Sequence, residues 1–226
     1  MKLYLYDIDY NNEVVFEDGN VLSVECESGD YFSKLVMNCK GINQGNLAVY
    51  DGENEISFEK DAIVIIDFFT LQSHEKTLLT KLYKLLEQLN RDEEFVIERL
   101  RTIVKAFKEI ADYSVDSYNA DLEINPSTNL TDYYKFFDLS FCRETKDVCQ
   151  NLIDFIDLLS MLKVYKLLVL VNVKSFFNQN QVEEIIKRCA YSNQKTLLID
   201  NVYTKEKCEN EAKILIDRDF YDIILK

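Results

Sequence analysis

The stretch VLSVECESGDYFSKLVMNCKG, residues 21–41, decides the fold, because it combines a strand, a short turn and a helix in direct succession. VLSVEC predicts the strand, and the turn follows in ESGD, residues 27–30. Apolar side chains then recur at helical spacing, at Phe32, Leu35, Val36 and Cys39. We expect the helix to be capped by Asp30 and to end before Gly41.

Other strand signals lie on both sides of this unit. LYLYD and EVVFED precede it, and AIVIID (62–67), LLVLV (167–171), TLLID (196–200), KILID and DIIL follow it. AIVIID is continuously apolar and β-branched, as is typical of a strand buried on both faces. A helix predicted over Gln179–Ala190 joins LLVLV to TLLID, and this order favours a right-handed parallel crossover within one sheet. The sequence therefore predicts an α/β fold with a mostly parallel sheet.

The middle of the chain has a different pattern. From Leu71 the apolar spacing becomes helical over two long stretches, with Asn90-Arg91-Asp92 as the expected joint between them. A further amphipathic helix follows the single proline, Pro126, in KDVCQNLIDFIDLLSMLKV. We therefore predict a helical leg at 71–163, inserted into a discontinuous head formed by 1–70 and 164–226.

Composition limits the class of protein. The 26 basic and 40 acidic residues give a net charge of −14, which favours solubility and repels nucleic acid. No apolar run reaches the roughly twenty residues of a membrane span, and no signal peptide is evident, so we expect a cytoplasmic protein with no membrane partner. The six cysteines include no C-x-x-C pair, so neither a zinc cluster nor a disulfide framework is predicted.

The turn at 27–30 lacks the chemistry of a phosphate-binding loop. In P-loop folds the first strand leads into GxxxxGK[ST], whose amides and lysine hold phosphates. Here the turn has one glycine, no Gly-Lys pair and two carboxylates. Asp67, at the end of AIVIID, resembles a Walker B aspartate, but an aspartate after a buried strand is very often only a polar strand end. We interpret the fold as a degenerate P-loop ATPase frame, and predict a binding protein that is not an enzyme.

The carboxylates of the chain also allow an enzymatic alternative. Nucleases hold two metals with clustered carboxylates, and residual NTPase activity would use similar groups. The candidates are Asp67, Asp200, Asp217 and Asp219, all of which could lie at strand ends.

Basic residues gather in one part of the sequence. Residues 164–207 hold 7 basic and 4 acidic side chains, whereas 1–70 hold 4 and 14. The candidates for contacts with DNA phosphates are Lys163, Lys166, Lys174, Lys187, Arg188 and Lys195. Six such residues are a modest footprint on a monomer, but a symmetric ring would repeat them around one channel. In a further alternative, the acidic surface binds a basic protein and the chain is an interaction adaptor.

The polar stretch DSYNADLEINPSTNLTD is a weak candidate for calcium, which takes six to eight oxygen ligands in irregular loops. It supplies Asp116, Asp121, Glu123, Asn125 and Asp132 but lacks the EF-hand spacing. On composition alone, an acidic hinge between helices is the simpler interpretation.

The order of these motifs resembles a known family, the short form of the type II-A CRISPR-associated adaptation proteins. The resemblance is strongest in KLLVLVNVKSFFNQNQVEEIIKRC, TLLIDN and IDRDFY, with support from YFSKLVMNC, AIVIIDFF and the DLE of 121–123. It covers nearly the full chain in the same order.

The resemblance implies an α/β head similar to P-loop ATPases without nucleotide hydrolysis, and an inserted helical leg. It also implies a homotetrameric ring that binds calcium, threads double-stranded DNA ends through a basic channel, and assists spacer acquisition with the CRISPR integrase and the RNA-guided nuclease. Asp121 and Glu123 correspond to the family's calcium ligands, although Asn125 and Pro126 depart from its acidic pattern. Lys34 matches the family's FSK motif and is implied as a channel residue.

Overall fold

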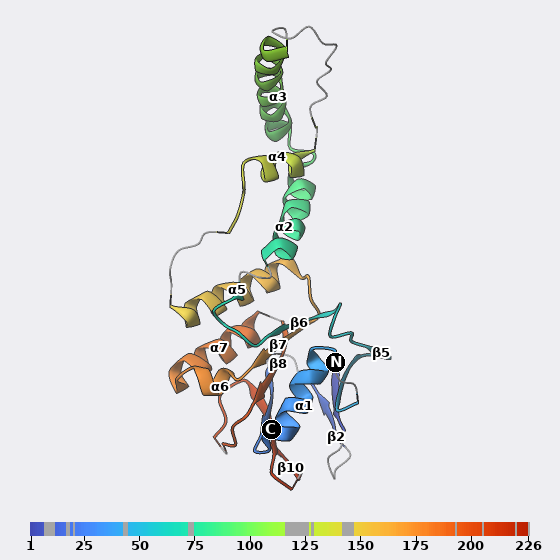
Figure 1. Ribbon diagram of the computed structural model, residues 1–226, viewed down its shortest axis with the longest axis vertical. Coiled ribbons are helices and arrows are strands. Elements are labelled where there is room, and N and C mark those ends of the chain that lie inside the picture. Colours follow the sequence, from blue (N-terminus) through green and yellow to red (C-terminus); the bar gives the residue numbers. More distant parts are fainter. Residues whose placement is uncertain are drawn as a thin grey trace. The chain divides into compact units, whose positions relative to one another are not determined.

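The computed structural model describes residues 1–6, 12–16, 19, 21–42, 45–71, 75–115, 127, 129–141, 147–192, 194–204, 206–219 and 221–225. The chain divides into two compact units (Figure 1). One, here called the sheet unit, comprises Met1–Ser73 and Glu144–Lys226, and the other, the helical unit, comprises His74–Arg143.

The sheet unit is built on a six-stranded sheet. Its strands, in spatial order, are β10 (Asp222–Leu225), β9 (Glu211–Ile216), β3 (Val21–Cys26), β8 (Lys195–Asp200), β7 (Leu167–Val171) and β6 (Ala62–Ile65). All neighbours pair in parallel except β10 with β9. The parallel strands are almost wholly buried, as expected where helices cover both faces. The predicted α/β class with a mostly parallel sheet is confirmed.

A second, antiparallel sheet lies in the same unit. It contains β2 (Asn12–Val15), β1 (Lys2–Leu5), β4 (Leu47–Asp51) and β5 (Asn54–Glu55), in that spatial order. β4 and β5 were not predicted from the sequence, because the short run LAVYD lies between turn residues. One face of this sheet is buried in the core through Leu3, Leu5 and Val49.

Helices cover the two faces of the parallel sheet. α1 (Gly29–Cys39) packs on one face, where Tyr31 and Leu35 join the main core. The other side carries α5 (Val148–Leu162), α6 (Val173–Phe176) and α7 (Gln179–Tyr191), with α5 packed on α7 and α7 on β8 and β3 (Figure 1). Because side chains alternate along a strand, the residues of β3 face these two layers in turn.

The helical unit contains α2 (Glu75–Asn90), α3 (Glu94–Val115) and α4 (Leu130–Phe136). α2 and α3 meet at the predicted joint, where α2 ends at Asn90 and the Asn90 side chain donates to Leu86 O (2.7 Å). α4 contacts α2, and Tyr83 donates a hydrogen bond to Leu139 O (2.5 Å). None of the helices in the described part of the chain combines the length and apolar character of a membrane span.

The boundaries of the units differ from the predicted leg at 71–163. The helical unit ends at Arg143, so α5 belongs to the sheet unit. The physical reason is the packing of its apolar face: Leu152, Ile156 and Leu159 are at most 1% exposed, and α5 packs on α7. Helical periodicity alone could not assign α5 to one unit or the other.

Candidate functional site at the carboxyl edge of the parallel sheet

The turn between β3 and α1 contains only Glu27 and Ser28, because β3 ends at Cys26 and α1 begins at Gly29. A phosphate-binding loop needs several residues here to wrap its amides around an anion. The helix is capped by Ser28, whose hydroxyl accepts a hydrogen bond from Tyr31 N (3.4 Å), and not by Asp30 as predicted. The carboxylate of Asp30 in the first turn would repel an anion.

A buried ionic cluster lies behind this turn, on the face of β3 opposite α1. Glu25 is 0% exposed and accepts hydrogen bonds from Lys174 Nζ (2.7 Å) and Thr204 N (2.7 Å). Lys213 Nζ lies 2.9 Å from the same carboxylate. Glu211 completes the cluster by contacting Lys174 and accepting from Cys208 N (2.9 Å). Two lysines thus pair with two carboxylates buried in the protein, where unpaired charges are costly.

The ionisation of this cluster follows from burial and pairing. Burial raises the pKa of Glu25, but the hydrogen bond and charge of Lys174, with the bond from Lys213, outweigh it and leave the pKa lowered. For Lys174 burial lowers the pKa, and the charges and hydrogen bonds of Glu211 and Glu25 raise it above its usual value. Both groups are therefore charged at neutral pH.

Asp200, at the end of β8, is the exception. Its Oδ1 accepts from Lys174 N (2.7 Å), whereas its buried Oδ2 has no hydrogen-bond partner in the described residues. Burial, aided by the charges of Glu25 and Glu211, raises the pKa of Asp200 to about 7, although Lys174 opposes this. Asp200 therefore holds a proton beside the cluster that it can lose near neutral pH.

Lys174 is consequently not the exposed phosphate contact that the sequence predicted. Its side chain is only 10% exposed and its ammonium group is held between Glu25 and Glu211. The error arose because both carboxylates are distant in sequence and only the fold brings them to α6.

The other predicted DNA contacts are distributed over both sides of the sheet. Arg188 forms a bidentate pair with Asp157, and Lys166 Nζ lies 3.6 Å from Asp61. Lys195 is half-buried and has an interaction of its own. The exposed candidates without an ion pair in the described residues are Lys34, Lys163 and Lys187.

These three lysines do not form one continuous patch on a single chain. Lys34 is on α1, whereas Lys187 is on α7, and these helices cover opposite faces of the sheet (Figure 1). Lys163 follows α5, in a left-handed conformation with φ 49°. Lys187 Nζ lies 6.0 Å from the centre of the Tyr191 ring. Lys34 and Lys187 could therefore contact one DNA molecule together only if they came from different copies of the chain.

The carboxylates of the nuclease alternative are not brought together as a metal site. Asp67 follows the outer strand β6, separated from β3 by β7 and β8, and it accepts from Phe69 N (2.8 Å). Asp217 accepts from Asp219 N and Tyr221 N, both at 2.9 Å, and so stabilises a turn. Among the described residues no group of three or more His, Cys, Asp or Glu side chains could hold a metal.

The predicted calcium ligands are described only in part. Asp121 and Glu123 lie outside the described residues, as does most of the polar stretch around them. Asp132, in the first turn of α4, accepts from Ser127 Oγ (2.6 Å) and lies 3.9 Å from Lys135 Nζ. One oxygen of Asp132 is thus occupied by a hydroxyl in this arrangement.

Sequence reasoning missed the partners of Lys174, although a signal was present. In VLSVEC the polar residues Ser23 and Glu25 alternate with apolar ones, and in EAKILI Glu211 and Lys213 do the same. Both strands are otherwise buried, so polar positions of one parity indicate charges that must pair inside the protein.

Together these features define an α/β protein with a strand, turn and helix arranged as in phosphate-binding folds, in which the turn lacks the phosphate-binding loop and an ionic cluster lies behind it. Residues 42–220 match the family model for CRISPR-associated protein (Cas_Csn2). The chain belongs to this family, which confirms the resemblance drawn from the sequence.

A search of curated proteins by sequence finds no match. Among solved structures, a metal-chelate type ABC transporter in an inward-facing conformation is 12% identical with a TM-score of 0.46, covering 100% of this chain and 83% of that one. A nucleotide-free ATP-binding cassette from an ABC transporter is 14% identical with a TM-score of 0.43, covering 89% and 82%.

Proposed function

We propose that this CRISPR-associated protein binds the ends of double-stranded DNA as a ring-shaped homotetramer in the cytoplasm, without catalysis, during spacer acquisition. Family membership is the observation that carries the proposal. The two-residue turn between β3 and α1 supports it, because a nucleotide phosphate would find no phosphate-binding loop there, and Arg218 at this turn is paired with Glu27 (3.1 Å). The partners we propose are the CRISPR integrase and the RNA-guided nuclease complex.

The surface of α3 supports assembly. This helix has no buried residue, yet its apolar side chains follow a helical stripe. The large exposed apolar side chains of the helical unit include Phe95, Ile103, Phe107, Ile110, Tyr113, Phe136 and Phe137. Some of them line a groove of about 420 Å³ and another of about 240 Å³ between α3 and α4. Apolar surface of this extent is typical of an interface, and we propose that copies of the chain cover it.

The distribution of charge fits a ring better than a monomer. The exposed Lys34, Lys163 and Lys187 are few on a chain of net charge −14. Closed symmetry would repeat them around one channel, while the acidic surface lies outside. Lys166, Arg188 and Lys195 remain secondary candidates, because each would first have to leave a partner in its own chain.

Calcium is part of the proposal through Asp121, Glu123 and Asp132. The expected result is that calcium raises the melting temperature and the mass of the assembled protein, because a ligand of the native state stabilises it by mass action. The control is Asp132→Asn, which should weaken this response. Identical mass and melting temperature in calcium and in chelator would remove calcium from the proposal.

The direct test compares linear duplex DNA with the same duplex as a closed circle, over a series of salt concentrations. We expect binding to the linear form only, weakening as salt rises. Lys187→Glu should reduce this binding, whereas the matched charge reversal Lys60→Glu, on an exposed lysine outside the proposed set, should not. Equal binding to both forms would refute threading of ends.

The enzymatic alternative is tested separately. The protein is incubated with labelled DNA or ATP in the presence of magnesium or manganese. The proposal expects no turnover beyond a buffer control. Turnover that Asp67→Asn abolishes would replace the proposal by the nuclease or NTPase interpretation.

A further inference from the structure

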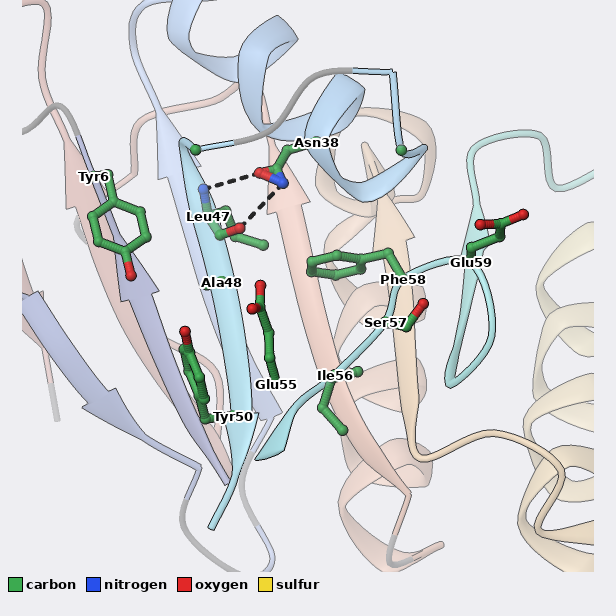
Figure 2. A pocket seen from close by; sticks show the side chains of 12 residues that line it. Tyr6, Asn38, Leu47, Ala48, Tyr50, Glu55, Ile56, Ser57, Phe58 and Glu59 are labelled. Atoms are coloured by element: carbon green, nitrogen blue, oxygen red, sulfur yellow. Dashed lines mark hydrogen bonds between the residues drawn. The ribbon is translucent and has the colours of Figure 1, made fainter. Parts of the chain in front are cut away.

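An open pocket of about 800 Å³ lies in the sheet unit, away from the edge described above (Figure 2). Its walls come from the end of β1, from β4 and β5, from the segment that follows β5, and from the end of α1. A volume of this size is within the range of ligand sites, about 300–1,000 Å³.

The walls of this pocket are anchored in the core. The buried Asn38 side chain donates from Nδ2 to Leu47 O and accepts from Leu47 N, both at 3.1 Å, which fastens the end of α1 to β4 (Figure 2). The fully buried Tyr31 donates its hydroxyl to Tyr6 O (2.7 Å). Ile56 N donates to Val49 O (2.7 Å) and so holds the segment after β5. The protein's own hydrogen bonds therefore hold these parts of the pocket walls in place.

The lining combines aromatic rings with carboxylates. Tyr6, Tyr50 and Phe58 contribute rings, and Glu55 and Glu59 contribute acids. Glu55 lies directly opposite Tyr50 in the β4–β5 register, and Figure 2 shows its carboxylate on the side of Tyr50 that faces Phe58. The charge of Glu55 raises the pKa of the Tyr50 hydroxyl, as expected for close neighbours.

Within the described residues no lysine or arginine lines the pocket. Lys2, opposite Tyr50 on β1, has its ammonium group 2.6 Å from Glu13. The carboxylates of Glu55 and Glu59 are exposed. An aromatic wall with unneutralised carboxylates attracts a cation both through the ring faces and through charge-assisted hydrogen bonds.

The surroundings indicate the kind of cation. Residues 1–70 hold 14 acidic and 4 basic side chains, and Asp51 and Glu53 extend the exposed acidic surface beyond the pocket. Such a surface attracts an extended basic segment over a distance, and the pocket is larger than one side chain requires.

We propose that this pocket binds arginine side chains of a basic segment on a partner protein. One guanidinium stacks on Tyr50 or Phe58 while its N–H groups donate to Glu55. Glu59, whose carboxylate points away from Glu55 beyond Phe58 (Figure 2), attracts a second basic side chain of the same segment. Arginine fits better than lysine, because its planar group can stack and form a bidentate pair at once. This inference is independent of DNA binding, since it uses a different surface and the opposite charge.

The test measures the fluorescence anisotropy of a labelled arginine-rich peptide with the full chain at ~150 mM salt, where exposed charges are screened beyond about 8 Å. The same peptide with citrulline, the neutral isostere of arginine, is the ligand control. We expect citrulline to weaken binding about tenfold or more, because it removes the charge and keeps the shape.

Variants locate the site. Glu55→Gln combined with Glu59→Gln should weaken peptide binding about tenfold, and Tyr50→Leu should weaken it as well. Asp51→Asn combined with Glu53→Gln removes the same charge from exposed residues outside the pocket and should have a much smaller effect. Equal losses of affinity in the two double variants would refute the assignment of arginine binding to this pocket. So would no binding, equal binding of the citrulline peptide, or complete competition by equimolar spermidine.

Discussion

Replacing Lys174 by methionine tests whether this residue is a structural ion or a DNA contact. Methionine keeps much of the length of the side chain and removes the ammonium group. Glu25 would then keep Lys213 and Thr204 as partners, but Glu211 would lose its cation. Both carboxylates are 0% exposed, so the lost ammonium group leaves a buried charge with fewer partners.

The expected cost follows from these contacts. Removing one partner from a buried ion pair costs about 3–5 kcal/mol, against a total of roughly 5–15 kcal/mol for a domain. Because the pKa of Glu25 is lowered in the folded protein, its ionised form stabilises the fold at every pH above the usual pKa of a glutamate. Because the pKa of Lys174 is raised, this lysine stays charged up to alkaline pH. The full penalty should therefore be seen at pH 7.

Urea unfolding followed by circular dichroism measures the free energy of unfolding. The matched control is Lys187→Met, an exposed lysine whose loss should change stability by about 0.5 kcal/mol or less. If Lys174→Met proved as stable as the parent and bound DNA more weakly than Lys187→Met, Lys174 would be a DNA contact. The interpretation of Lys174 as a structural ion in a buried cluster would then be wrong.

Three other predictions concern protonation, assembly and thiol chemistry. Folded Asp200 keeps its proton up to about pH 7, whereas the unfolded chain loses it near 3.8. Stability should therefore fall as pH rises through this window, and Asp200→Asn should reduce that fall by about 4 kcal/mol, measured by urea unfolding at pH 4 and 8; an unchanged pH profile would contradict it. Phe107→Asp on α3 should lower the mass measured by light scattering, with Lys105→Asp, an exposed polar position on the same helix, as control. Burial raises the pKa of Cys26, Cys39 and Cys189 to about 12, so a thiol reagent at pH 8 should modify them only after unfolding, and rapid labelling of the native protein would contradict their burial.

Much of the sheet could be predicted because its strands have strong local signals. LLVLV at 167–171 and VLSVEC at 21–26 are short, apolar and bounded by polar residues, and both form buried strands. The two-residue strand β5 has no such signal. α5 was predicted as a helix of the leg, whereas it belongs to the sheet unit. Periodicity shows that a helix has a buried face but not which element covers that face.

The candidate site was less predictable. The sequence shows by its missing glycines and lysine that the turn after β3 lacks a phosphate-binding loop. It could not show that Lys174 is buried, because Glu25 is 149 residues away along the chain. The aromatic and acidic pocket is likewise assembled from four separate segments.

The sequence by itself determined the class of fold, the order of the strand motifs along the chain, and the lack of a GxxxxGK[ST] motif in the β3–α1 turn. These depend on local composition and on side-chain periodicity, which neighbouring residues determine. Only the tertiary structure decided which charges are paired and which are exposed, since that depends on residues far apart in the chain that packing brings within hydrogen-bond distance. It therefore removed Lys174 from the candidate DNA contacts, left Lys34, Lys163 and Lys187 exposed, and revealed the pocket beside Tyr50.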